Sequence, residues 1–222
     1  MVSADHRQWA ALVATIVLTY VTGVVDAVGF LALDRVFTGN MTGNIVILGM
    51  GVAGADDLPV LGPAIALAAF TIAAFLAGLV LRARPKGWQH RVTVLLTIGA
   101  VTLAALSVLG GTDAHSGAVL QIVMAAATAA VMGSQAMVAR AVAVADMTTV
   151  VVTSTLASLA GETWTTRGGG VLRNRRFAAI ATIFVGAVTG ALLVKWHISA
   201  PFALSAILTG AVALLGHRHL VG

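Results

Sequence analysis

Residues 116–139 read SGAVLQIVMAAATAAVMGSQAMVA and contain no charged side chain. At a rise of about 1.5 Å per residue, a helix of roughly 20 apolar residues spans the ~30 Å hydrocarbon core of a bilayer. Two further charge-free runs of similar length occupy residues 93–112 and 177–194. The chain is therefore predicted to be an all-α, polytopic membrane protein that crosses the bilayer several times.

The composition of the whole chain agrees with this class. Of its 222 residues, 59% are hydrophobic and only 9% are charged, whereas soluble domains carry charge on about a quarter of their residues. The net charge of +5 comes from basic residues in short connections. That pattern indicates orientation in a membrane and not nucleic-acid binding. The absence of cysteine excludes disulfides and thiolate metal sites.

Six long apolar segments are predicted to be transmembrane helices. They lie at about residues 9–33, 61–82, 91–111, 117–140, 177–195 and 199–216. Two shorter segments, 37–55 and 146–161, follow long helices without a hydrophilic connection. The first begins FTGNMTGN, whose glycines and asparagines are poor helix formers. Because too few regular apolar residues remain in them to span a bilayer, we predict two re-entrant half-helices.

The second half of the chain resembles the first at an offset of about 110 residues. Gly23 precedes Thr42 by 19 positions and Gly133 precedes Thr153 by 20. We therefore predict one integral membrane domain, 1–222, built from the repeats 1–112 and 113–222. Three crossings per repeat is an odd number, so the repeats should have inverted orientation, a recurrent plan in transporters.

The basic connections support this topology. Residues 82–91 and 163–176 are both strongly basic, and basic loops stay in the cytoplasm. The two connections share a side only if the short segments enter and leave by the same face. Six crossings then place the N-terminus and the C-terminus in the cytoplasm as well.

A family resemblance appears in the first repeat. Residues 23–33, GVVDAVGFLAL, followed by residues 36–44, VFTGNMTGN, resemble the signature of the YoaK family of uncharacterised bacterial membrane proteins. The resemblance covers essentially the whole chain, and members are usually described as having six transmembrane helices. It implies residence in the bacterial inner membrane but no substrate, so function must be argued from the residues.

Asp26 is the sharpest functional candidate, because a carboxylate inside a membrane-spanning helix is costly and usually functional. Thr22 and Thr19 lie on the same helical face, one and two turns earlier. This polar stripe must face protein or water. Asp26 is predicted to carry a proton or cation, or to contact a solute. The alternative is a structural ion pair or a hydrogen bond to the backbone of the first re-entrant segment.

Opposite charges occupy comparable places in the two repeats. Asp146 aligns with Arg35, and Arg140 ends the helix equivalent to the one that carries Asp26. Asp26–Arg140 and Arg35–Asp146 are therefore candidate ion pairs that would gate or latch the repeats. The alternative is static pairing or extension of the arginines to the membrane surface, which is common for long basic side chains near helix ends.

The two re-entrant segments form the predicted binding surface. Half-helices that begin near Asn44 and Ser154 would point their positive ends at the membrane centre, which favours an anion or an acceptor-rich polar solute. Tight packing through Gly39-x-x-x-Gly43 is the alternative. The predicted lining residues are Thr38, Gly39, Asn40, Thr42, Gly43, Asn44, Thr153, Ser154 and Thr155.

Gln121, Thr128 and Gln135 recur every seven residues on one predicted helix. They would either line a permeation path or form hydrogen bonds between helices, as polar side chains often do in membrane bundles. Both interpretations stay open from the sequence.

These patterns predict a small-solute transporter or channel with a site at the membrane midplane. A non-transporting membrane scaffold is the alternative. No metalloprotease, phosphate-loop or hydrolase motif occurs in the chain, so we expect no enzyme, metal or cofactor. Besides the lipid bilayer and the solute, a second copy of the chain is a predicted partner, through Gly186-x-x-x-Gly190.

Overall fold

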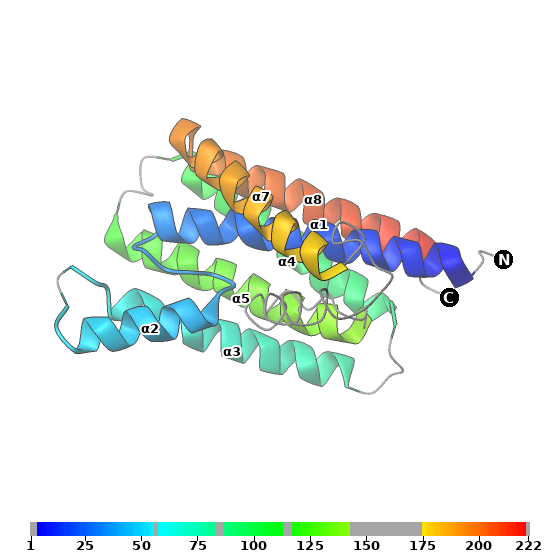
Figure 1. Cartoon of the computed structure of the whole chain (residues 1–222), viewed down its shortest axis with the longest axis horizontal. Helices are drawn as coiled ribbons and strands as arrows, with labels where there is room; N and C mark the ends of the chain where they lie inside the picture. Colours follow the sequence, from blue (N-terminus) through cyan, green and yellow to red (C-terminus); the bar gives the residue numbers. More distant parts are fainter. Residues whose placement is uncertain (1–3, 56, 83–86, 113–116, 143–174, 221–222) are drawn as a thin grey trace, which may run out of the picture.

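The computed structural model describes residues 4–55, 57–82, 87–112, 117–142 and 175–220, and its regular elements in these ranges are helices. The predicted segment 146–161 lies outside them. The helices are α1 (Ala4–Ala32), α2 (Met41–Val52), α3 (Leu61–Leu81), α4 (His90–Gly110), α5 (Ala118–Val142), α7 (Arg175–Trp196) and α8 (Ser199–Leu220) (Figure 1).

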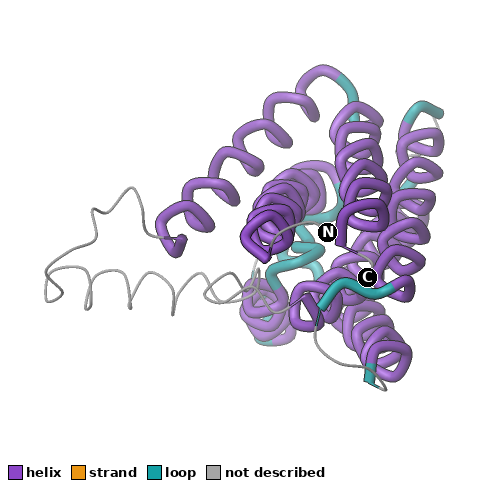
Figure 2. Tube along the Cα trace, turned by 90° about the vertical axis from the view of Figure 1, so that its right-hand side faces the viewer, coloured by secondary structure: helices purple, strands orange, loops and turns teal. Residues whose placement is uncertain are grey.

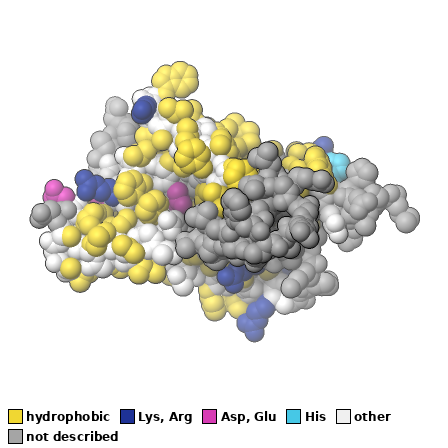
Figure 3. All heavy atoms as spheres, viewed as in Figure 1, with side chains coloured by type: hydrophobic (Ala, Val, Ile, Leu, Met, Phe, Trp, Pro, Cys, Tyr) yellow, Lys and Arg dark blue, Asp and Glu magenta, His cyan; other side chains and the backbone are white. Residues whose placement is uncertain are grey.

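Six of these helices are long and apolar enough to cross a membrane, which confirms the six predicted long segments. Their apolar spans run from 20 to 25 residues. The exception is α2, whose 12 residues measure roughly 18 Å. Hydrophobic side chains cover much of the described part of the face in Figure 3, as expected for a surface in contact with lipid. The protein is therefore a multi-pass membrane protein.

The long helices alternate in direction along the bundle (Figure 1). α1 begins and α8 ends at the same end of the molecule, whereas the connections 33–40, 53–60 and 197–198 lie at or toward the opposite end. α1 and α5 run antiparallel, and α7 is inclined to the other long helices (Figures 1 and 2). The start of α1 and the end of α8 therefore lie on the same side of the membrane.

Three helix pairs make the most extensive contacts: α1 with α7, α3 with α5, and α4 with α8. Glycine permits the closest approaches in the first two pairs. A Cβ atom on Gly23 would collide with the backbone of Ile183 in α7, and one on Gly133 would collide with the backbone of Phe70 in α3. Small residues at such crossings are the usual basis of helix packing in membranes.

The glycine motif predicted for a homodimer is used within the chain. Gly186 and Gly190 lie against the backbone of Tyr20 and Val24 in α1. Since these glycines are covered by α1, they do not supply a surface for a second copy. The homodimer therefore loses the motif on which its prediction rested.

Burial along α1 and α5 follows the same pattern. Over residues 11–20 and 121–130 the order of buried, half-buried and exposed positions is identical. Buried side chains of both helices join one hydrophobic core cluster together with side chains of α4 and α8, among them the fully buried Phe202. The two helices thus occupy equivalent packing positions.

Candidate functional site

The chain reverses direction immediately after α1. Asp34 and Arg35 have positive φ angles of 60° and 55°, an uncommon backbone conformation for residues other than glycine. The turn is closed by the Val36 N–H, which donates to the carbonyl of Gly29 at 3.2 Å. A Cβ atom on Gly29 would collide with the Val36 carbonyl. The irregular residues 37–40 then run back along α1 toward Asp26.

Asp26 holds this returning segment. Its Oδ1 accepts hydrogen bonds from the backbone N–H groups of Thr38 (2.8 Å), Gly39 (2.6 Å) and Asn40 (3.4 Å), and from the Thr38 hydroxyl (3.3 Å). Asp26 is 8% exposed and Thr38 is fully buried. Of the two alternatives to a transport role left open by the sequence, the hydrogen bond to the following backbone is the one formed.

Gly39 lies where there is no room for a side chain. A Cβ atom there would sit 2.8 Å from the methyl carbon of Thr22 and 3.5 Å from both carboxylate oxygens of Asp26. The short distance from the Gly39 N–H to Oδ1 depends on this close approach, because a larger residue would push the segment away from α1.

The two Thr-Gly-Asn triplets have different roles in starting α2. Asn40 caps the helix: its side-chain oxygen accepts from the N–H of Gly43 at 3.2 Å. Asn44 is fully buried and forms two hydrogen bonds with the backbone of Phe37. Its Oδ1 accepts from the Phe37 N–H (2.8 Å), and its Nδ2 donates to the Phe37 carbonyl (2.6 Å). Thr42 is exposed and stands apart from this network.

The predicted ion pair between Asp26 and Arg140 is not formed. Arg140 is exposed in the last turn of α5. Because α5 is antiparallel to α1 and Gln135 already lies beside Leu18, Arg140 lies nearer the start of α1, away from Asp26. Arg35, from the second predicted pair, donates to the carbonyl of Asp57 at 3.3 Å.

The remaining predicted site residues cannot be placed. Asp146, Thr153, Ser154 and Thr155 lie outside the described residues. The second pair, Arg35–Asp146, and the second half of the binding surface therefore stay predictions.

Gln135 joins α5 to the site on α1. Its Nε2 donates to the Leu18 carbonyl and to the Thr22 hydroxyl, both at 3.1 Å. Gln135 thus forms hydrogen bonds between helices, one of the two roles left open by the sequence. The seven-residue spacing drew attention to Gln135, but nothing in the sequence linked it to Thr22.

Threonines extend the site along the buried face of α1. Thr15, Thr19 and Thr22 are 3–6% exposed, and each hydroxyl donates to the carbonyl four residues earlier. Their oxygen atoms can still accept a hydrogen bond, as Thr22 does from Gln135. The predicted polar stripe therefore faces the protein interior.

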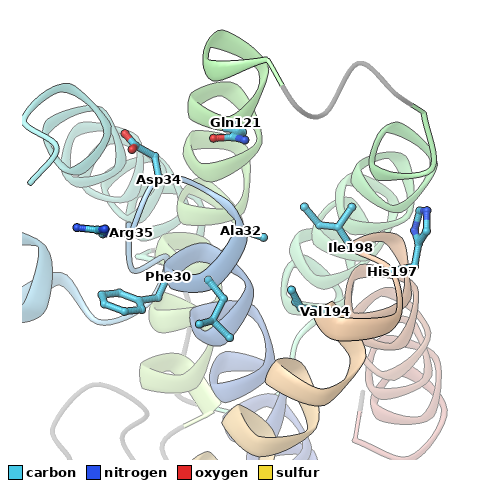
Figure 4. A pocket seen from close by; sticks show the side chains of 9 residues that line it. Phe30, Ala32, Asp34, Arg35, Gln121, Val194, His197 and Ile198 are labelled. Carbon is cyan, nitrogen blue, oxygen red and sulfur yellow. The ribbon is translucent and has the colours of Figure 1, made fainter. Parts of the chain in front are cut away.

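An open cavity of about 820 Å³ lies at the end of α1 that carries the reversal of the chain. Figure 4 shows Phe30, Asp34 and Arg35 on one side, Gln121 of α5 above, and His197 at the turn between α7 and α8. Phe30 is one helical turn beyond Asp26, and its ring stacks on Phe37 with centroids 5.0 Å apart. The pair connects Phe30, which lines the cavity, to the residue that precedes Thr38.

Within the described part of the chain, no group of three His, Asp or Glu side chains gathers into a metal site. The charged chemistry of the interior there rests on Asp26, the one charged side chain among its buried residues.

Comparisons with known proteins place this arrangement in a family. The sequence profile of the family described as "Protein of unknown function (DUF1275)" matches residues 14–215. Over 160 residues the chain is 32% identical to the UPF0700 transmembrane protein YoaK of Bacillus subtilis (strain 168), covering 72% of this chain and 68% of that protein. No solved structure matches the chain. The resemblance seen in residues 23–44 is thereby confirmed.

Proposed function

The chain belongs to the DUF1275 family, a family of unknown function, and we propose from its site that it is a small-solute transporter or channel of the bacterial inner membrane. In this proposal Asp26 and residues 38–44 form one half of a central site. The stretch around Thr153, Ser154 and Thr155 forms the other half.

The observation that carries the proposal is the partnership between Asp26 and non-helical backbone inside the bundle. An ionisable side chain in a membrane-spanning helix is expensive and is a functional candidate by default. Here its partners are N–H groups of a non-helical segment that leads into a short helix. Irregular backbone at membrane depth is tolerated only where protein buries it or where it lines a water-filled cavity, and broken helices of this kind form transporter sites.

Exposed polar groups at the same depth support an aqueous cavity. Asn40 is exposed, although its N–H lies 3.4 Å from Asp26 Oδ1. Thr42, two residues further, is exposed as well. An amide and a hydroxyl in contact with hydrocarbon would be unfavourable, so water is the better environment for both side chains.

The packing of α1 and α5 supports two inverted repeats. The two helices are antiparallel, share a burial pattern, and each presses a glycine on the backbone of another long helix, α7 or α3. Exchanging the halves of the chain exchanges the pair α1–α7 with the pair α5–α3 and leaves α4–α8 unchanged. In the proposed transporter α2 is a re-entrant half-helix, the segment 146–161 is its counterpart, and both termini are cytoplasmic.

The end cavity completes the proposed path. A solute would enter the cavity lined by Asp34, Arg35 and Gln121. Its path would then pass Phe30, which lines the cavity one helical turn from Asp26.

A non-transporting scaffold remains the second candidate, and one observation favours it. All of the hydrogen bonds of Asp26 to described residues are internal and hold the chain reversal in place. In a scaffold the carboxylate would only hold the segment before α2 in place through these hydrogen bonds, and no water would reach the interior beside it.

Hydration of the segment 38–44 separates the two candidates. The chain has no cysteine, so single cysteines at Asn40 and Thr42 can be labelled with a membrane-impermeant thiol reagent without background. The transporter predicts labelling of both positions from the membrane face that carries residues 53–60.

Two controls define the range of this experiment. Ala55→Cys, exposed in the α2–α3 connection, should label fully. Ile72→Cys, 59% exposed at the middle of α3, should stay unlabelled because lipid covers it. If Asn40→Cys and Thr42→Cys stay as unreactive as Ile72→Cys while Ala55→Cys labels, the transporter proposal is overturned in favour of the scaffold.

A further inference from the structure

The hydrogen-bond donors that face Asp26 already have acceptors within the protein. The N–H groups of residues 38–40 converge on Asp26 Oδ1. The Phe37 N–H donates to Asn44, and the Gly43 N–H donates to Asn40. The positive end of α2, which would otherwise attract an anion, is thus occupied by a carboxylate and an amide of the chain itself.

The buried atom left without a hydrogen-bond partner beside this network is an acceptor. Gln135 is 3% exposed, and its Oε1 has no hydrogen-bond partner among the described residues. The other amide atom, Nε2, must be the nitrogen because one of its partners, the Leu18 carbonyl, can only accept. None of the hydrogen bonds between described residues reaches Asp26 Oδ2.

Thr22 connects these two acceptor positions. It lies one turn before Asp26 on the same face of α1, it accepts from Gln135 Nε2 at 3.1 Å, and its methyl group touches Gly39. Thr19 and Thr15 continue the row on the buried face. Their hydroxyl protons are committed to backbone carbonyls, so the row offers oxygen lone pairs and no free donor.

We infer that the species accepted beside Asp26 is a monovalent cation, with the Asp26 carboxylate as its countercharge and the oxygens of Thr22 and Gln135 as neutral positions along its path. The inference rests on the proposed transport function and specifies what that site takes. It replaces the anionic solute favoured by the sequence, since the buried backbone N–H groups that face Asp26 already donate to its carboxylate.

Charge and ligand type select this class of ion. Carboxylate, amide and hydroxyl oxygens are ligands for hard cations and not for soft metals. A buried charge requires compensation, and the single carboxylate of Asp26 is balanced by one positive charge. A divalent ion would bring an excess charge into the interior that no described buried residue neutralises.

Thermal unfolding of the detergent-purified full chain in different salts tests the inference. At constant ionic strength, Tm should rise by about 5 °C in sodium or potassium chloride relative to choline chloride. Replacing chloride by gluconate should leave the rise unchanged. Asp26→Asn should abolish the rise, since asparagine keeps an oxygen for the N–H groups of residues 38–40 but removes the charge. Thr22→Val and Gln135→Leu should at least halve it.

Thr71→Val is the matched control for Thr22→Val. The Thr71 hydroxyl also donates to the carbonyl four residues earlier, but Thr71 lies exposed on α3, and its variant should keep the full rise. If Asp26→Asn does not fold, Thr22→Val and Gln135→Leu still decide the matter. A rise in Tm that follows the anion, a rise unchanged in both variants, or no response to any salt would overturn the cation inference. If Asn40→Cys still labels in that case, transport itself stands.

Discussion

α1 and α5 have the same order of buried and exposed positions over residues 11–20 and 121–130, and each carries a glycine against a neighbouring backbone. Their buried faces nevertheless differ in chemistry. Where α1 has Thr15, Thr19, Thr22 and Asp26, the positions 110 residues later in α5 have Ala125, Ala129, Met132 and Ala136.

This difference shows that α1 and α5 share the residues needed for close packing but not the polar residues of the site. Close helix packing needs small residues at crossings, and both helices supply them. A buried polar group needs a partner, and α1 has one because residues 37–40 return to it. Two polar side chains are buried on α5: the Thr128 hydroxyl donates to the Met124 carbonyl of its own helix, whereas the Gln135 amide donates to α1. The two halves thus share an architecture while the site is concentrated on α1.

The largest expected effect comes from removing the carboxylate that distinguishes the two helices. Asp26→Ala leaves the N–H groups of Thr38 and Gly39 unpaired in the interior, and each such group costs about 1–3 kcal/mol. We expect a loss of about 4 kcal/mol in the free energy of unfolding, measured by denaturant titration in detergent. Ala136→Ser at the matching position of α5 should change it by less than about 1 kcal/mol.

Asp26→Asn refines this result, because it retains one acceptor oxygen. It should lose less than half of what Asp26→Ala loses. Equal losses in the two variants would mean that charge, and not hydrogen bonding to residues 38–40, makes the main contribution of Asp26 to stability.

An intermediate and matched effect is expected at the two crossing glycines. In Gly23→Ala and in Gly133→Ala the added methyl group meets the backbone of Ile183 or Phe70, and overpacking of this kind costs roughly 2 kcal/mol. The two losses should be similar, and they should add in the double variant because the sites touch different helices. A large loss at one glycine and none at the other would contradict equivalent packing of α1 and α5.

The smallest effect is expected at a glycine outside both crossings. No atom lies within 4 Å of a Cβ built on Gly49 in α2, so Gly49→Ala should gain about 0.5–1 kcal/mol from helix propensity. The gain would show as a slightly higher Tm. Destabilisation would instead indicate that α2 needs glycine against a surface absent from its described surroundings.

Asp26 could be identified from the sequence as the centre of a site, because a carboxylate within a charge-free helical span is rare and costly. Its partner could not. Arg140 and the backbone of residues 38–40 were both available along the chain, and the choice depends on register. In the antiparallel pair Gln135 lies beside Leu18, which carries Arg140 away from Asp26. The role of Gln135 could not be predicted either, because the seven-residue spacing shows which residues share a face of one helix and does not show which helix that face contacts.

By itself, the sequence determined that this protein is a membrane bundle with six long apolar helices, and that a short helix follows the broken segment at residues 37–44. Both conclusions depend on local properties, the length of apolar runs and the poor helix propensity of FTGNMTGN. Only the tertiary structure decided that Gly186 and Gly190 pack on α1, that Asp26 binds N–H groups, and that an acceptor of Gln135 is left over. These facts depend on which residues of different helices lie side by side. Buried donors and acceptors find their partners among such spatial neighbours, and the sequence does not show which residues those are.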